Sequence, residues 1–368
     1  MKFENHRSAN PGAGGGKVGS IQGGLAAAAL SLALLAAPAV ARSEVPEPNG
    51  CPTDRGLATA APAGDLRITF LGVSTLLFDD GESQLLVDGY FTRPGFAETA
   101  FGRIGPEKAK LKAQLDAAKV GRLRAVLVAH AHHDHAMDAP MTADLHKDAV
   151  IVGGASTVNL GVAAQVRKAQ LCTTHDRQHL YFGPYEVEVF KSPHGDTGRL
   201  LGWALTGDTP SDLTLPARFW RLKDTENFSY LIRHGDREIL VHPSTDVTPG
   251  AYDGVSAQVV FLGAGRLGKL SQEDITTYWR QVGDAVGAST VVPVHWDNFM
   301  RPIDGPLKSM PWPLDRFELG QQRLGRAIAE GDRPVSMLRL DARDVLVVAP
   351  AGAILVDRAS GPNKNAPR

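Results

Sequence analysis

The chain has 368 residues, of which 43% are hydrophobic, and its formal net charge at pH 7 is −1. This length and composition suffice for one large globular domain or two ordinary ones. Because 39 basic residues are balanced by 40 acidic ones, the basic excess typical of nucleic-acid-binding surfaces is missing, and no nucleic-acid partner is expected.

The N-terminal residues 1–41 are expected to form a secretory signal peptide. Lys17 precedes an apolar run over residues 25–37, and Ala39-Val-Ala41 then offers a small-residue cleavage site. The run is too short to span a bilayer as a helix, and no later stretch is long or apolar enough. We therefore expect an exported protein, secreted or periplasmic, that does not span the membrane once the leader is removed.

Residues 42–64 are rich in proline, alanine and glycine, a composition typical of a linker or an extended arm. The chain has two cysteines, Cys51 in this arm and Cys172. In an oxidising compartment an even pair allows one disulfide, which would attach the arm to the body of the protein. Two free thiols are the alternative.

The elements after the arm begin with an antiparallel meander. Short apolar runs are separated by turn residues, among them Asp80-Gly81, which is typical of a hairpin. The three expected strands cover residues 66–71, 74–78 and 84–87. An insertion over residues 93–121 follows, and it carries a helix predicted for residues 107–119 with an apolar stripe through Leu111 and Leu115.

The middle of the chain alternates strands and helices. Residues 123–129 form an apolar run rich in valine and leucine that indicates a buried strand, and residues 185–190 alternate in the manner of a strand with one polar face. The other expected elements are a strand at 149–152, helices at 141–147 and 156–169, and a hairpin of strands at 227–232 and 237–241.

The C-terminal part repeats this alternation. Ser271 with Asp274 three residues later is typical of a capping box at the start of a helix. The expected elements are strands at 257–262 and 290–294, helices at 272–286 and 316–330, and short strands near 335 and 345. We expect one folded domain over residues 65–357 and a disordered tail at 358–368. The alternation fits an α+β fold of the αββα type, with two mixed sheets between helical layers.

Six residues, His130 to His135, read H-A-H-H-D-H and hold a third of the 12 histidines. They follow the apolar run at 123–129, so they lie on a loop that leaves a buried strand. Residues two apart share a side of an extended chain, so His130 and His132 can converge if the backbone there is extended. Neutral imidazole and carboxylate together suit zinc or another borderline first-row ion. The alternative is a polar surface loop with histidines present by chance.

The motif resembles the signature of the metallo-β-lactamase-fold hydrolases. That family also places an aspartate at the end of an early strand, here Asp88, a histidine after a later strand, here His194, and a last histidine, here His295. The resemblance covers roughly residues 66–357 and implies a catalytic domain with the αββα fold. His295-Trp296 and Gly89-Tyr-Phe-Thr-Arg-Pro94 look most like the lactonase-like branch of the family.

The resemblance also implies roles for these residues. One metal would be held by His130, His132 and His194, and a second by Asp134, His135 and His295. Two Zn²⁺ ions are expected, with Mn²⁺ or iron as alternatives. Asp134 and Asp88 are the predicted catalytic residues, Asp88 by orienting the histidine loop. The alternative for Asp88 is a turn residue ahead of Gly89.

One ligand departs from the family pattern. The family has Gly-Asp after the strand at 237–241, and this aspartate bridges both metals, but the chain reads His242-Pro-Ser-Thr-Asp246 and aligns Ser244 with the carboxylate. The loop could bring Asp246 inward, His242 could supply a different ligand, or the second metal could be weakly held. We favour Asp246 as the metal ligand.

The function implied is that of a metal-dependent hydrolase, which uses a metal-bound hydroxide to cleave a small ester, lactone, amide or phosphoester. Two alternatives remain: an iron-dependent redox enzyme of the same fold, and a non-catalytic binding protein with a degenerate metal site. Substrate choice is expected to reside in three loops, at residues 93–121, 207–224 and 297–313.

Residues Gly263 to Gly268 read G-A-G-R-L-G and formally match a dinucleotide-binding fingerprint. Such a site also needs an acidic residue at the tip of the next strand. That strand ends at His295 instead, so a nucleotide-binding fold is not expected.

Overall fold

A computed structural model describes residues 50–195, 202 and 204–359 of the chain. The predicted signal peptide at 1–41 and most of the predicted tail at 358–368 lie outside the described residues. Among the residues that are described, no helix combines the length and apolar character needed to cross a bilayer.

The first of two sheets has eight strands in the order β15-β14-β1-β2-β3-β4-β5-β6. Its bounds are β1 Leu66–Phe70, β2 Leu76–Asp79, β3 Gln84–Val87, β4 Leu123–Leu127, β5 Val150–Gly153, β6 Leu171–Thr173, β14 Val345–Val348 and β15 Ile354–Asp357. The expected meander is present, since β1, β2 and β3 pair antiparallel, and β3 to β6 then continue in parallel.

The second sheet has seven strands in the order β13-β12-β11-β10-β9-β8-β7. Its bounds are β7 His179–Phe182, β8 Tyr185–Ser192, β9 Asn227–His234, β10 Arg237–His242, β11 Val259–Gly263, β12 Thr290–Val294 and β13 Ser336–Met337. Strands β10 to β13 are parallel, while β7 to β10 pair antiparallel. Both sheets are therefore mixed, as expected.

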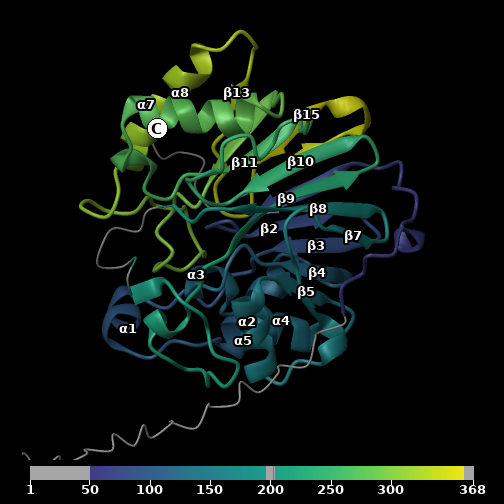
Figure 1. Cartoon of the computed structure of the whole chain (residues 1–368), viewed down its shortest axis with the longest axis vertical. Helices are drawn as coiled ribbons and strands as arrows, with labels where there is room; N and C mark the ends of the chain where they lie inside the picture. Colours follow the sequence, from purple (N-terminus) through teal and green to yellow (C-terminus); the bar gives the residue numbers. More distant parts are fainter. Residues whose placement is uncertain (1–49, 196–201, 203, 360–368) are drawn as a thin grey trace, which may run out of the picture. The chain divides into compact units, whose positions relative to one another are not determined.

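Helices cover the outer faces of the two sheets (Figure 1). The bounds are α1 Phe96–Phe101, α2 Lys108–Ala117, α3 His133–Ala136, α4 Ala139–Leu145, α5 Ala155–Ala163, α7 Gln272–Trp279 and α8 Phe317–Ala329. In Figure 1 α2, α4 and α5 lie beside the first sheet, and α7 and α8 lie beside the second. This confirms the predicted αββα sandwich.

The strands follow from where their side chains are buried. Leu66, Ile68 and Phe70 of β1 are buried whereas Arg67 is exposed, so this strand has one wet face. All five residues of β11 are buried, because the first sheet covers one face of this strand and helices cover the other face. A single apolar core joins the facing sides of both sheets with α7 and α8, and a second lies between the first sheet and α2, α4 and α5.

Helix α5 is shorter than the predicted 156–169. Gln165 has a positive φ of 59°, and the Val166 N–H donates to the Gly161 carbonyl at 2.9 Å. These are features of a Schellman-type helix end, which satisfies the last carbonyls and turns the chain away. A left-handed residue other than glycine carries no signal in the sequence, and the prediction overran the end for this reason.

The arm packs along the edge of the sandwich through its described part. Cys51 forms a disulfide with Cys172 on β6, across a sequence separation of 121 residues. The Gly50 N–H donates to the Leu171 carbonyl at 3.1 Å, and the Pro52 carbonyl accepts from the Tyr181 N–H at 2.8 Å. Of the two alternatives for the cysteines, the structure contains the disulfide.

Candidate metal centre

Six of the seven predicted metal ligands meet at one edge of the sandwich, where loops leave both sheets. The first cluster consists of His130, His132 and His194, and the second cluster of Asp134, His135 and His295. In each cluster one potential ligand atom per residue lies within 4.8 Å of the others. The loop after β4 supplies four of the six residues, and the loops after β8 and β12 supply one histidine each.

The backbone after β4 explains how one short segment serves both clusters. His132 is extended, with φ −62° and ψ 154°, and it is the N-cap of α3. The rings of His130 and His132 consequently approach within 4.5 Å between centroids, as expected from an extended chain. The single turn of α3 then directs Asp134 and His135 towards His295.

Hydrogen bonds indicate which ring nitrogen carries the proton in four of the five cluster histidines. Carbonyl and carboxylate oxygens can only accept, so a ring nitrogen that contacts one must donate. These contacts are His132 Nε2 to the Leu205 carbonyl at 3.2 Å, His135 Nδ1 to Asp88 at 2.8 Å, His194 Nδ1 to the Gly195 carbonyl at 2.7 Å and His130 Nδ1 to Asn227 Oδ1 at 3.0 Å. The opposite nitrogen of each ring is left with a free lone pair.

The free lone pairs of the first cluster face one another. His130 Nε2 and His194 Nε2 are 3.2 Å apart, and both carry lone pairs if their Nδ1 atoms donate as described. Two facing lone pairs repel unless a cation lies between them. In the second cluster His135 Nε2 is 3.1 Å from His295 Nε2, and Asp134 Oδ2 is 3.4 Å from the same atom. This donor set of five imidazoles and one carboxylate fits a borderline first-row cation.

Burial keeps the first cluster neutral. It lowers the pKa of His130 well below its usual value and that of His132 to about 3, and neighbouring histidines add to the effect. In the second cluster burial also disfavours the charged forms, but ion partners outweigh it. Asp88 and Asp134 raise the pKa of His135, and the pKa of Asp134 falls well below its usual value because of His135 and His133.

Asp88 fixes the orientation of the histidine loop. It is fully buried and accepts hydrogen bonds from the Ser74 hydroxyl, from His135 Nδ1 at 2.8 Å and from the Ala129 N–H at 2.8 Å. It also has a positive φ of 56° ahead of Gly89. Asp88 is therefore both the turn residue of the alternative and the residue that orients the histidine loop.

Asp88→Asn is expected to weaken metal binding by about 10- to 100-fold. The asparagine side chain is uncharged, and it has one accepting oxygen where the carboxylate uses two oxygens to accept from three donors. Titration of metal-free protein with zinc against a chelating indicator measures this change. Asp116→Asn, at an exposed ion pair with Lys112, is the matched control and should bind as the parent does. Equal affinity in both variants would contradict the orienting role.

His295 is held by a separate set of contacts. Its backbone N–H donates to the Val73 carbonyl at 2.6 Å, and the backbone N–H of Val73 donates to the Asp297 carboxylate at 2.6 Å. Arg93 pairs with Asp297, and each of these side chains is only 1% exposed. Gly72 is required beneath this pair, because its φ is +82° and a Cβ there would lie 2.3 Å from the Arg93 guanidinium.

The structure does not bring Asp246 to either cluster, so the preference for Asp246 as a ligand is not supported. Asp246 is exposed, and its carboxylate accepts from the adjacent Val247 N–H at 2.9 Å. The reason lies in Ser244, whose hydroxyl accepts from the Gly195 N–H at 2.7 Å and thus holds the loop against the His194 segment. The chain turns outward after this contact.

His242 lies among core residues and not with the clusters. It is fully buried, and its Nδ1 contacts the Ser229 hydroxyl at 2.8 Å and the Tyr252 hydroxyl at 2.7 Å. Burial lowers its pKa to about 4, so the ring is neutral at pH 7. Of the three residues considered for the bridging position, Ser244 is the one that contacts the segment of the first cluster.

Three supporting residues were not found from the sequence. Asn227 accepts from His130, and its amide nitrogen donates to the Pro193 carbonyl at 3.2 Å, which fixes the orientation of the amide. Asp224 accepts from the Ala131 N–H at 2.6 Å, and burial raises its pKa to about 6. Asp138 accepts from Thr92 at 2.7 Å. Each is a single polar residue without a motif, so no sequence signal marks it.

The glycine-rich segment after β11 is explained by close packing. A Cβ on Gly265 would lie 3.2 Å from His295 Nδ1, and one on Gly268 would lie 2.1 Å from the Arg316 carbonyl. The predicted capping box of Ser271 and Asp274 is confirmed at the start of α7. The glycines therefore allow the segment to pass between His295 and α8.

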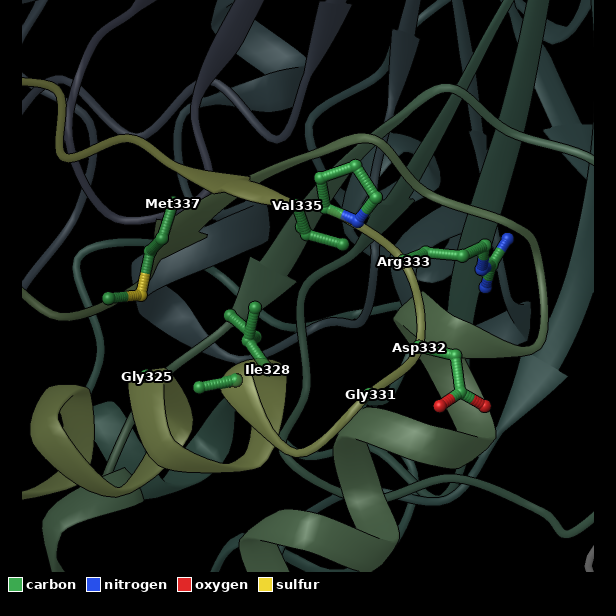
Figure 2. Close-up of a pocket in the computed structure, with 9 residues that line it drawn as sticks. Gly325, Ile328, Gly331, Asp332, Arg333, Val335 and Met337 are labelled. Carbon is green, nitrogen blue, oxygen red and sulfur yellow. The ribbon is translucent and has the colours of Figure 1, made fainter.

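A hollow of about 550 Å³ lies where α8 leads into β13 (Figure 2). Ile328, Val335 and Met337 line it, with Asp332 and Arg333 at its border. None of its lining residues belongs to either cluster. The hollow is therefore separate from the metal centre.

Comparison with known proteins gives partial similarity. No protein-family model matches the chain. Ribonuclease J from Mycolicibacterium smegmatis is 31% identical over 157 residues, which is 40% of this chain. The chain spans only 27% of the length of that protein.

Solved structures of similar architecture are more distant in sequence. The metallo-β-lactamase fold protein YhfI from Bacillus subtilis has 13% identity and a TM-score of 0.46, with 77% of this chain and 99% of that chain covered. Igni18, a metallo hydrolase from Ignicoccus hospitalis, has 13% identity, a TM-score of 0.47 and coverage of 80% and 100%. CmlA, a diiron β-hydroxylase from Streptomyces venezuelae, has 16% identity, a TM-score of 0.48 and coverage of 78% and 54%.

Proposed function

We propose that the protein is a metal-dependent hydrolase that cleaves a small ester, lactone, amide or phosphoester. The observation that carries the proposal is the convergence of five imidazoles and one carboxylate from three loops, with the lone pairs of the first cluster directed at one another. We propose Zn²⁺ as the natural cation, with Mn²⁺ or iron as alternatives. Cations bound there would lower the pKa of bound water towards neutrality and polarise the bond to be attacked.

The residues of the chain prepare the site in two ways. His130 and His132 remain neutral because burial depresses their pKa values, so protons compete weakly with a cation for their lone pairs. Asp134 remains ionised and places one negative charge in the second cluster. The same carboxylate can accept a proton from an attacking water, which is why it is proposed as a catalytic residue.

Zinc-loaded protein is expected to contain more than one equivalent of metal and to hydrolyse generic esters or phosphodiesters. Elemental analysis and a substrate panel test both points. A firm one-to-one stoichiometry would reject the version with two metals. Bound iron with visible absorption would favour the redox alternative, and ligand binding without turnover at any metal would favour the binding protein.

The second equivalent of metal to bind, at whichever cluster, is proposed to be held more weakly than the first equivalent. Asp134 is the only carboxylate of the six residues, so one negative charge faces two dications, and Ser244 is uncharged. Repulsion between the cations is then poorly offset. The weaker binding follows because Ser244 stands where the metallo-β-lactamase-fold hydrolases, which the chain resembles, have a bridging aspartate.

Ser244→Asp is therefore expected to tighten binding of the second equivalent of zinc by at least about tenfold, because a negative charge is added on the loop that contacts the His194 segment. Isothermal titration of the metal-free protein should resolve two sites whose affinities move closer together. Thr248→Asp adds the same charge at an exposed position and is the matched control. An equal effect of both substitutions would show that only net charge matters.

We also propose that the protein acts outside the cytoplasm and belongs to the lactonase-like branch, with a carbon–oxygen bond as the target. The leader pattern at residues 1–41 and the disulfide of Cys51 with Cys172 support export, since disulfides persist mainly in oxidising compartments. Recovery of mature protein that begins after Ala41 would agree with this, whereas recovery of the intact leader on soluble cytoplasmic protein would contradict it.

A further inference from the structure

His133, the third histidine of the motif, belongs to neither cluster. It is 6% exposed, and neither of its ring nitrogens has a hydrogen-bond partner among the described residues. Its nearest ion partner is Asp134, at 3.7 Å from Nδ1, which is too far for a hydrogen bond. Buried polar groups are nearly always paired, so a ring with two unpaired nitrogens requires an explanation.

Tyr90 presents the same problem beside it. Its side chain is fully buried and its hydroxyl has no partner within the described part of the chain. The two rings meet edge to face, with centroids 6.1 Å apart. Tyr90 comes from the loop after β3 and His133 from the loop after β4, so two separate segments each bring an unpaired polar group to one place.

Two phenyl rings complete the surroundings of His133. The centroid of Phe219 lies 5.8 Å and that of Phe299 5.7 Å from the imidazole, and Phe299 also lies 6.1 Å from the ring of His295. Both phenyl rings are only partly buried. They come from the loops at 207–224 and 297–313, so two of the three loops expected to choose the substrate converge on His133.

We propose that these four residues form the subsite for one part of the substrate, beside the second cluster. Tyr90 and His133 are covered in this conformation, so the substrate reaches them when the partly buried rings of Phe219 and Phe299 move aside. Tyr90 and His133 then hydrogen-bond to its carbonyl or ester oxygen, and Phe219 and Phe299 pack against a planar apolar group attached to it. Phenol, imidazole and phenyl groups carry no fixed charge at these positions, which suits a neutral carbonyl compound rather than a phosphate. The substrate class is a small aryl ester or lactone.

This inference rests on the proposed hydrolase for its reaction but not for its binding site. The competing explanation is an internal water that pairs with Tyr90 and His133 and never meets a ligand. In that case the hydroxyl serves stability alone. The two explanations differ in what removal of the hydroxyl does.

The first experiment measures substrate preference as the ratio of kcat/KM for phenyl acetate to that for ethyl acetate, with zinc-loaded protein. Phe219→Ala and Phe299→Ala are expected to reduce this ratio at least about tenfold, because aromatic pairs lose their packing. Phe101→Ala, at an exposed ring of α1, is the matched control and should leave it unchanged. Phe299→Leu keeps apolar volume if the alanine variant does not fold.

The second experiment measures binding without turnover, with phenylacetamide as probe and thermal shift as readout, in metal-free and zinc-loaded protein. Tyr90→Phe, which removes one unpaired hydroxyl, is expected to weaken probe binding about tenfold with zinc content and melting temperature unchanged. Because probe binding needs no hydrolysis, absence of turnover with every metal would refute the hydrolase while leaving this test valid.

Two results would overturn the proposal. One is a lower melting temperature of Tyr90→Phe with unchanged probe binding, which is the signature of an internal water. The other is an unchanged phenyl-to-ethyl ratio in Phe219→Ala and Phe299→Ala when both variants retain zinc. Weakened probe binding together with a reduced ratio supports the subsite.

Discussion

His132→Ala is expected to abolish almost all hydrolysis. His132 Nε2 donates to the Leu205 carbonyl, so Nδ1 is the nitrogen available to the first cluster, and the substitution leaves this cluster with two imidazoles. Loss of a ligand should exceed the effect of about 10- to 100-fold that follows loss of a residue orienting a ligand. We therefore expect a decrease in kcat/KM of more than about 10³-fold, with loss of close to one equivalent of metal.

The measurement combines metal analysis with hydrolysis of generic esters and phosphodiesters. His175→Ala is the matched control, because His175 is exposed and, within the described part of the chain, its ring has a hydrogen bond only with the neighbouring Asp176 carbonyl. Parent-like turnover by His132→Ala would refute a hydrolase that works through the first cluster. A similar loss in both variants would point to unfolding instead.

The double substitution Cys51→Ser and Cys172→Ser is expected to lower the free energy of unfolding by about 2–5 kcal/mol. The disulfide closes a loop across 121 residues, and loop-closure entropy that it removes from the unfolded chain grows slowly with loop length. The backbone bonds of the arm, such as Gly50 to Leu171, remain and cannot replace this constraint.

Denaturant unfolding of zinc-loaded protein measures the change. Neither cysteine contacts the clusters, so zinc content and turnover of the folded variant should equal those of the parent. The parent unfolded in the presence of reductant should reproduce the double variant. A difference in unfolding free energy below about 1 kcal/mol would mean that the arm constrains the unfolded chain little.

The layers and the loop of histidines were predictable because both depend on short-range patterns. Apolar runs of four to six residues mark buried strands, and β3 at Gln84–Val87 occupies the residues predicted for it. The spacing of His130 to His135 alone indicated a candidate metal-binding loop. His194 and His295 lack a local motif, and resemblance to a family, not spacing, indicated them.

The path of the loop after β10 could not be predicted. Whether Asp246 turns inward depends on the contact of Ser244 with Gly195, which lies 49 residues away in the sequence. The short strands β6, β7 and β15 were also missed. Each has three or four residues and lies at the edge of its sheet, where it is paired on one side only.

Each cluster takes ligands from loops of both sheets: His130 and His132 follow a strand of the first sheet, whereas His194 follows a strand of the second, and Asp134 and His295 are divided in the same way. A cation at either position would link the two sheets through its ligands. Metal binding would then raise the free energy of unfolding, by about 4 kcal/mol at a free metal concentration a thousand times the Kd. A newly made chain without metal would consequently be the more fragile form, and the supply of metal would govern how long it survives proteolysis.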